Sequence, residues 1–149
     1  MEAETYPDPR VATFINNNFV PVRLHVKEHP EAMGRFNVDW TPTVLIVDAD
    51  GKELYRIEGF LPPDEFLAQL QLGFGHAQFT KKNFQDAERQ FRDVCENLPG
   101  TDAAAEAMYW AGVSRYKATN DGSALKATAQ AFKQRYQNSI WAKKASVWG

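Results

Sequence analysis

Hydrophobic and polar residues follow strand and short-helix patterns over the first 70 residues of the chain. Asp8 followed by Pro9 is typical of a helix start, and an apolar face then runs to Ile15. In residues 20–26 every second residue is valine or leucine, which is the period of a half-buried strand. A short helix is expected over residues 30–36, so the chain opens as helix, strand, helix.

A hairpin and another helix complete this first part. Residues 43–47 form a continuous apolar run, and the Asp-Gly step within residues 48–51 favours a tight turn into a second strand that ends at Ile57. The pattern of residues 62–70 then predicts a helix. The predicted order is α-β-α-β-β-α, an α/β segment, and the remainder of the chain reads as all-α.

The second part repeats itself with a period of 37 residues. A small residue, a large aromatic residue and a second small residue recur in register, as Gly75 and Gly112, Phe79 and Tyr116, and Ala87 and Ala124. Pro99-Gly100 ends the first unit of the repeat. A last helix is predicted over residues 139–148.

Composition and charge change near Leu70. Residues 1–70 carry 6 basic and 12 acidic residues, a net charge of −6, whereas residues 71–149 carry 11 basic and 7 acidic residues, a net charge of +4. The sum of −2 lacks the basic footprint of a nucleic-acid-binding protein. No apolar run approaches the roughly 18 residues of a membrane-spanning helix, so we expect neither nucleic acid nor membrane as a partner, and a cytoplasmic location.

Few residues suggest metal or nucleophilic chemistry. Cys95 is the only cysteine and is expected to be a buried apolar residue rather than a reactive thiol. His25, His29 and His76 fit no metal-ligand spacing. The Asp-x-Asp-Gly sequence at residues 48–51 is expected to be a turn rather than a calcium loop. We therefore expect no metal and no cofactor.

Residues 36–60 resemble the second half of a thioredoxin fold. The resemblance is carried by the Thr41-Pro42-Thr43 step before an apolar strand, the Asp-Gly hairpin and Gly59 at the end of the last strand. It implies a cis bond between Thr41 and Pro42. It also implies a substrate-binding surface formed by Trp40, Thr41 and Pro42, in which the backbone of Thr41 pairs with an extended substrate chain.

The family's first central strand and its Cys-x-x-Cys motif have no counterpart in this sequence. The predicted fold is therefore an incomplete thioredoxin-like fold in which residues 20–26 and 43–47 flank an empty strand slot about 10 Å wide. Three explanations of the slot are open: the natural protein begins upstream of Met1, the two strands pair differently, or another chain fills the slot. We favour the first of these, and the open strand edges also point to a homodimer.

The helical part resembles tetratricopeptide repeats, with Ala87-x-x-x-Phe91 and the closing Pro99 as the marks of the resemblance. Its aromatic residues are expected mainly to pack between helices. They are Phe74, Phe79, Tyr109, Trp110 and Tyr116. A concave groove of such repeats would bind a peptide or protein partner, and its candidate residues are Tyr109, Arg115 and Tyr116.

The predicted domains are a thioredoxin-like domain at residues 1–71 and a helical repeat domain at residues 72–149. Two functional classes are consistent with them. In the first, the chain is part of a thiol–disulfide redox protein whose catalytic cysteines lie upstream of Met1, which makes this chain inactive alone. In the second, it is a non-catalytic adaptor that binds a partner through the helical groove.

Overall fold

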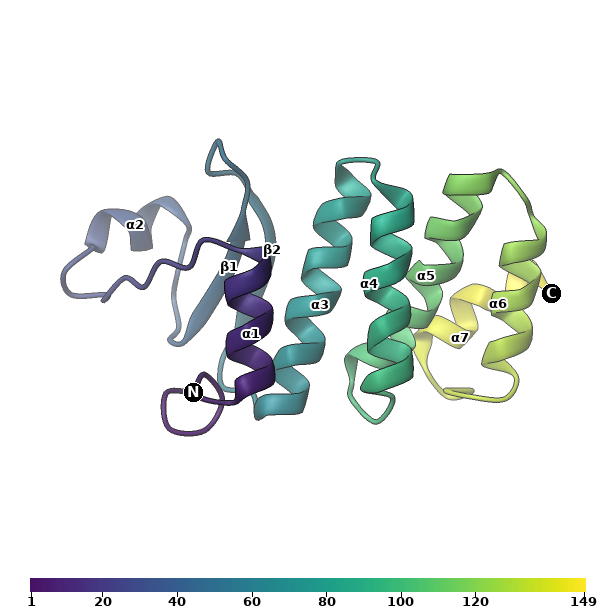
Figure 1. Cartoon of the computed structure of the whole chain (residues 1–149), viewed down its shortest axis with the longest axis horizontal. Coiled ribbons are helices and arrows are strands. Elements are labelled where there is room, and N and C mark those ends of the chain that lie inside the picture. Colours follow the sequence, from purple (N-terminus) through teal and green to yellow (C-terminus); the bar gives the residue numbers. More distant parts are fainter. The chain divides into compact units, whose positions relative to one another are not determined.

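Two units make up the structure (Figure 1). The computed structural model describes residues 1–149, of which Met1–Leu67 form the first unit and Ala68–Gly149 the second. The boundary lies inside a helix, four residues before the boundary predicted at residue 71. None of the helices combines the length and the apolar character that crossing a membrane requires.

The first unit contains two short helices, a hairpin and the beginning of a long helix. The elements are α1 (Pro9–Asn18), α2 (Pro30–Arg35), β1 (Thr43–Val47), β2 (Glu53–Glu58) and the first residues of α3 (Pro63–Thr80). Asp8 caps α1 because its side chain accepts a hydrogen bond from the N–H of Arg10, and Pro9 occupies the first helical position, as predicted.

The hairpin has the predicted turn. β1 and β2 are antiparallel, with Val44 opposite Ile57 and Ile46 opposite Tyr55. The Asp48 carboxylate accepts hydrogen bonds from the N–H groups of Asp50 and Lys52, so it closes the turn itself. These two strands are the whole sheet, so the second edge of β1 has no strand beside it.

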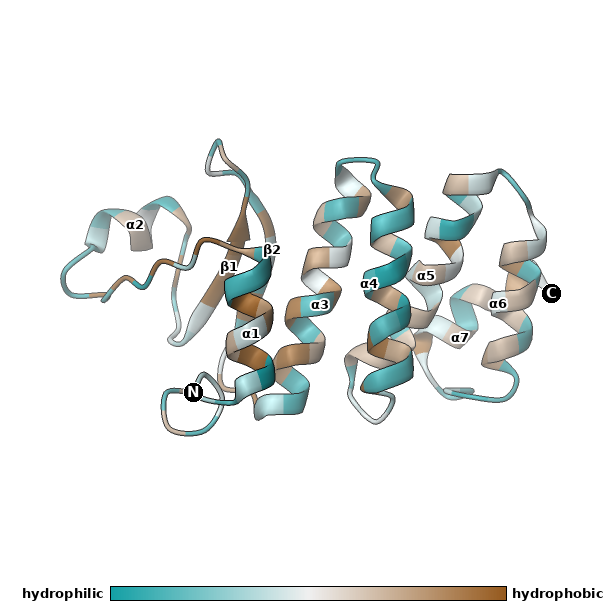
Figure 2. Ribbon diagram, viewed as in Figure 1, coloured by the Kyte–Doolittle hydropathy of each residue, from teal (hydrophilic) through white to brown (hydrophobic).

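The predicted strand over residues 20–26 is wrong. The backbone there runs as an extended segment between α1 and α2, but no strand lies beside it, and a strand exists only through hydrogen bonds to a neighbour (Figure 1). Val20 and Val22 are exposed, and Figure 2 shows the hydrophobic colour of this segment. The observed order of the first unit is therefore helix, extended segment, helix, hairpin, helix.

The core of the first unit joins its N-terminal residues to the start of α3. Val11 and Phe66 are fully buried, and the ring of Tyr6 meets that of Phe66 edge to face at 5.8 Å between centroids. The buried Thr5 hydroxyl donates a hydrogen bond to the carbonyl of Leu61 at 2.6 Å. The hairpin contributes Ile46 to the buried residues.

The second unit is helical throughout. After the end of α3 come α4 (Phe84–Asn97), α5 (Ala103–Thr119), α6 (Ser123–Phe132), α7 (Ile140–Ala145) and a 3₁₀ turn (Ser146–Trp148). The helix predicted over residues 62–70 continues to Thr80 as one helix, α3. No proline interrupts it after Pro63, and Gly75 lies where a side chain of the next helix approaches closely.

The same close contact occurs twice in the second unit, 37 residues apart. A Cβ atom on Gly75 would lie 2.6 Å from the ring of Phe91, and a Cβ atom on Gly112 would lie 2.0 Å from the hydroxyl of Thr128. The two glycines and the two side chains are both related by the 37-residue period. Each glycine therefore lets the first helix of a pair approach the second.

Candidate functional site

The loop before β1 is held in place by an arginine of the hairpin. The guanidinium of Arg56 donates hydrogen bonds to the carbonyl oxygens of Phe36 and Asn37. Glu53 orients this arginine through an ion pair of 2.6 Å. Asn37 ends the preceding helical stretch with a positive φ of 51°. The loop therefore reaches Trp40 from a fixed position.

Trp40, Thr41 and Pro42 form what we call the Trp40 surface. The Trp40 side chain is 65% exposed, which is unusual for so large an apolar group. Its carbonyl accepts a hydrogen bond from the hydroxyl of Thr43 at 2.5 Å, and the carbonyl of Pro42 accepts one from the N–H of Gly59 at 2.8 Å. The peptide bond between Thr41 and Pro42 is cis, which confirms the prediction.

Thr41 differs from Trp40 and Pro42 because its backbone groups make no hydrogen bond. Neither its N–H nor its C=O has a hydrogen-bond partner within the chain, and the residue is exposed. One donor and one acceptor on the same residue match the groups that an extended polypeptide offers to a strand edge. This residue can therefore receive a peptide backbone.

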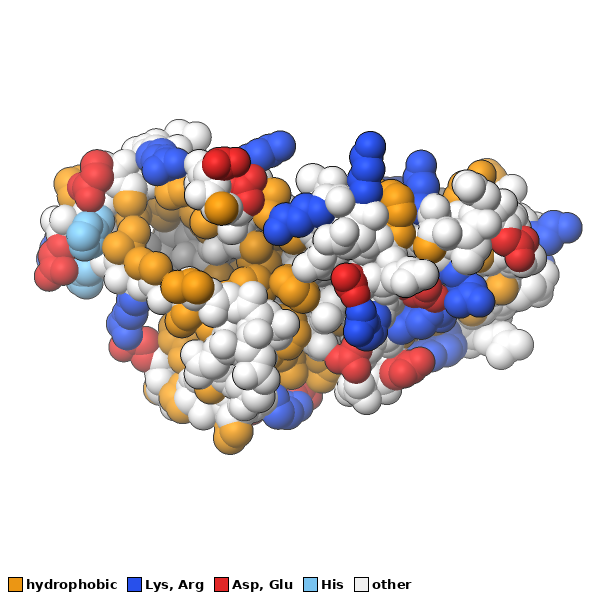
Figure 3. Space-filling model, turned by 45° about the horizontal axis from the view of Figure 1, so that its top comes forward, with side chains coloured by type: hydrophobic (Ala, Val, Ile, Leu, Met, Phe, Trp, Pro, Cys, Tyr) orange, Lys and Arg blue, Asp and Glu red, His pale blue; other side chains and the backbone are white.

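A hollow of about 330 Å³ adjoins the Trp40 surface. Figure 3 shows the first unit hollowed, with hydrophobic side chains around the opening. The residues that line the hollow are Val26, Met33, Val38, Asp39, Trp40 and Thr41. Apolar side chains make up most of this wall, with one carboxyl group among them, so the hollow suits an apolar side chain.

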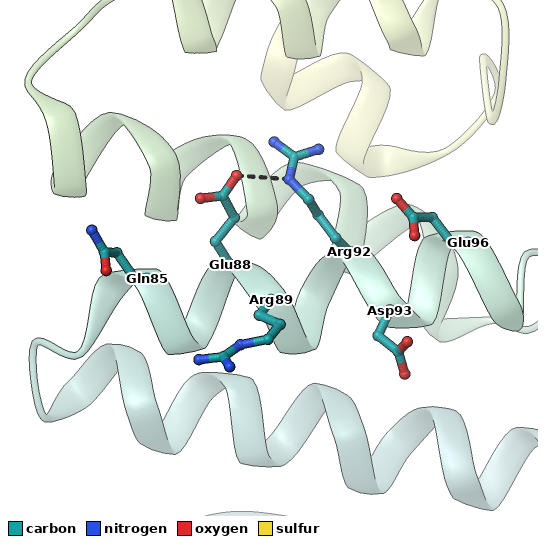
Figure 4. A pocket seen from close by; sticks show the side chains of 6 residues that line it. All are labelled: Gln85, Glu88, Arg89, Arg92, Asp93 and Glu96. Atoms are coloured by element: carbon teal, nitrogen blue, oxygen red, sulfur yellow. Dashed lines mark hydrogen bonds and ion pairs between the residues drawn. The ribbon is translucent and has the colours of Figure 1, made fainter.

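A second, more polar hollow of about 350 Å³ lies on α4 of the second unit. Its lining consists of Gln85, Glu88, Arg89, Arg92, Asp93 and Glu96. Figure 4 shows Glu88 and Arg92 pointing to one side of the helix and Arg89 and Asp93 to the other. Arg115 of α5, one of the predicted groove residues, reaches Glu88 at 3.4 Å, and Arg92 reaches the same carboxylate oxygen at 2.7 Å.

The predicted groove residues of α5 lie in different surroundings. The ring of Tyr109 stacks on that of Trp148 at 4.8 Å and also contacts Trp141, so it packs within an aromatic cluster. Arg115 is exposed and ion-paired, and Tyr116 is half-buried. The structure therefore places Arg115 beside the charged face of α4, and Tyr109 with the C-terminal aromatic residues.

Most of the other aromatic residues named in the sequence analysis pack against one another in the second unit. Phe79 meets Phe84 and Trp110 edge to face at 5.1 and 5.4 Å between ring centroids. The imidazole of His76 lies against Trp110 and its Nε2 is 2.9 Å from the carboxylate of Glu106. This histidine is therefore a partner in the helix packing.

Cys95 is buried, as predicted, and its thiol is a poor nucleophile. Burial raises the pKa of the Cys95 thiol to about 11, so the thiolate is scarce at neutral pH. Its sulfur donates a weak hydrogen bond to the carbonyl of Ala104 at 3.5 Å. No group of three or more histidine, cysteine or acidic side chains is arranged to hold a metal ion.

The residues of the Trp40 surface were predicted from the sequence, whereas the hollow beside it and the arginine that fixes the loop were not. The role of Arg56 gives no local signal, because the two carbonyl groups that it binds lie 19 and 20 residues away. The sequence contains one sign of the hollow. Met33 and Val38, which line it, are apolar residues close to Trp40 in the chain.

The comparison with protein families gives one match. Residues 1–73 match the family model of the thioredoxin-like domain. Searches of the curated proteins and of the solved structures found no match. The match covers the α1-to-β2 segment and the first part of α3, and therefore includes the Trp40 surface and the hollow.

Proposed function

Because residues 1–73 form a thioredoxin-like domain, we propose that this part of the chain binds an extended segment of another polypeptide at the Trp40 surface. The observation that carries the proposal is the free N–H and C=O of the exposed Thr41, beside a hollow of about 330 Å³. A peptide bound there is extended at Thr41 and places one apolar side chain in the hollow.

The bound segment is expected to be apolar, with a basic residue nearby. Val26, Met33 and Val38 offer the hollow an apolar wall, and Trp40 adds a large exposed ring. Asp39 supplies the one carboxyl group of the lining, which favours a lysine or arginine next to the inserted side chain.

Replacing Thr41 by proline is expected to reduce peptide binding by about tenfold or more, because it removes the N–H that the peptide carbonyl needs. Thr41→Val is the matched control, since it changes the side chain and keeps both backbone groups. The measurement is a titration by calorimetry with a short peptide of valine and threonine that carries a central leucine and one lysine. Equal affinity of the proline variant, with unchanged circular dichroism, would contradict this role for Thr41.

We also propose that this binding serves thiol–disulfide exchange and thus cell redox homeostasis. The thioredoxin-like domain favours that role. Exchange begins with attack by a thiolate, and burial raises the pKa of the Cys95 thiol to about 11, so Cys95 is a poor source of one at neutral pH. The reacting cysteines would then be ones that do not belong to these 149 residues, and they would act on a disulfide of the peptide held at Thr41.

The purified chain is therefore expected to show no disulfide reductase turnover of its own. Insulin reduction in the presence of dithiothreitol should proceed at the rate of the reagent alone, and the Cys95→Ser variant should give the same rate. Turnover clearly above that of Cys95→Ser would show that Cys95 reacts, against its burial.

A non-catalytic adaptor is the second candidate function. It is favoured by the charged hollow of about 350 Å³ on α4, where Glu88 is paired with both Arg92 and Arg115. A partner held there would carry charges of both signs, and its binding would not depend on Thr41. A partner whose affinity falls with Arg115→Ala and is unchanged by Thr41→Pro would favour the adaptor.

A further inference from the structure

The guanidinium of Arg56 is engaged at all three of its nitrogen atoms. Nε and Nη2 donate to the two carboxylate oxygens of Glu53 at 3.1 and 2.6 Å. Nη2 also donates to the carbonyl of Phe36, and Nη1 donates to the carbonyl of Asn37 at 3.4 Å. One planar group therefore joins a carboxylate of β2 to two consecutive carbonyls at the start of the loop.

Most of the wall of the hollow belongs to the segment that Arg56 holds. Met33 is in α2, and residues 38–41 are in the loop that follows, so that all but one of the lining residues come from this stretch. The N–H of Val38 donates to the carbonyl of Met33 at 2.9 Å, which ties the loop to the end of α2. A shift of the loop at its first residues therefore moves the wall of the hollow.

The far end of the loop is fixed by groups other than Arg56. The hydroxyl of Thr43 donates to the carbonyl of Trp40, and the N–H of Gly59 donates to the carbonyl of Pro42. Without the guanidinium, the loop keeps these two hydrogen bonds and loses the two at its start. The Trp40 surface is then held from one side only, so the loop can leave the arrangement seen in the structure.

We propose that Arg56 is a positioning residue of the peptide site, which keeps the loop in the arrangement that binds. The inference rests on the function proposed above for Thr41. Arg56 is not among the residues that line the hollow, so it acts through the loop rather than by contact with the peptide. When the loop is in the binding arrangement for only a fraction of the time, the apparent affinity falls by that fraction.

The charge of Arg56 has to be separated from its geometry. The hydrogen bonds with Glu53 raise the pKa of Arg56, and the charges of Glu58 and Asp39 raise it further. The guanidinium therefore also offsets part of the charge of Asp39, the carboxyl group of the hollow. Arg56→Lys keeps this positive charge, but its single nitrogen cannot hold Glu53 and two carbonyls at once. A change in peptide binding by this variant is thus an effect of geometry.

Peptide binding by Arg56→Lys tests the proposal. With the leucine- and lysine-containing peptide described for Thr41, the affinity of the variant should be about fivefold or more below that of the original chain. Stopped-flow kinetics should place this loss in the association rate, because a positioning residue changes how often the loop is ready to bind. A group that contacts the peptide would change the dissociation rate instead. Arg10→Lys is the matched control, since Arg10 pairs with Asp8 and Asp64, which lie outside the loop.

Hydrogen exchange of the chain without peptide tests the positioning itself. The amide of Val38 should exchange about tenfold faster or more in Arg56→Lys, and the amide of Gly59, at the other end of the loop, should change little. Equal peptide affinity of the two proteins, or equal exchange at Val38, would overturn the proposal. If the original chain binds no peptide, the function proposed for Thr41 fails and this inference fails with it, whatever the exchange at Val38.

Discussion

Replacing Phe91 by alanine is expected to lower the free energy of unfolding by about 3–5 kcal/mol. Phe91 of α4 is completely buried, its ring touches the backbone at Gly75, and it meets the ring of His76 at 5.1 Å between centroids. Glycine provides no side chain that could fill the space, so the variant retains a cavity between α3 and α4.

Urea unfolding followed by circular dichroism measures this loss. Phe60→Ala is the matched control, because Phe60 is 50% exposed and its removal leaves no closed cavity. The control should lose far less stability. A loss below about 1 kcal/mol for Phe91→Ala would mean that the contact between α3 and α4 contributes little to the second unit.

A second large effect is expected for Gly112→Ala, with a loss of about 1–3 kcal/mol. The new Cβ atom would lie 2.0 Å from the hydroxyl oxygen and 2.8 Å from the Cβ atom of Thr128. Thr128 is buried and its hydroxyl donates to the carbonyl of Ala124, so it has little room to move. The helices α5 and α6 must therefore separate.

Gly34→Ala provides a control with the opposite sign. Gly34 is in α2, and nothing lies within 4 Å of the position of its Cβ atom. Alanine is the better helix former by about 1 kcal/mol, so this variant should be as stable as the original chain or more stable. If both glycine variants gain stability, the close approach of α5 to α6 at Gly112 is not needed.

Local sequence signals predicted several elements correctly. Asp8 and Pro9 indicated the start of α1, and the Asp-Gly step indicated the hairpin. These signals work because capping and turn formation depend on residues within a few positions of each other. The burial of Cys95 followed in the same way from the apolar face of its helix.

Features that depend on distant residues were not predicted. The alternation in residues 20–26 indicated a strand, but a strand also needs a neighbour, and no pattern within the segment reveals whether one is present. The continuation of α3 past Leu70 was missed because the change in composition suggested a break there. The hollow beside Trp40 depends on residues as far apart as Val26 and Thr41.

Hydrogen exchange at the amide of Thr41 tests the central proposal most directly. With saturating peptide, exchange at Thr41 is expected to slow by about tenfold or more, because its N–H gains a partner. The N–H of Gly59 already donates to the carbonyl of Pro42, so its exchange should change little. Protection confined to Thr41 and the residues of the hollow would support the account. Peptide binding that leaves exchange at Thr41 unchanged would contradict it.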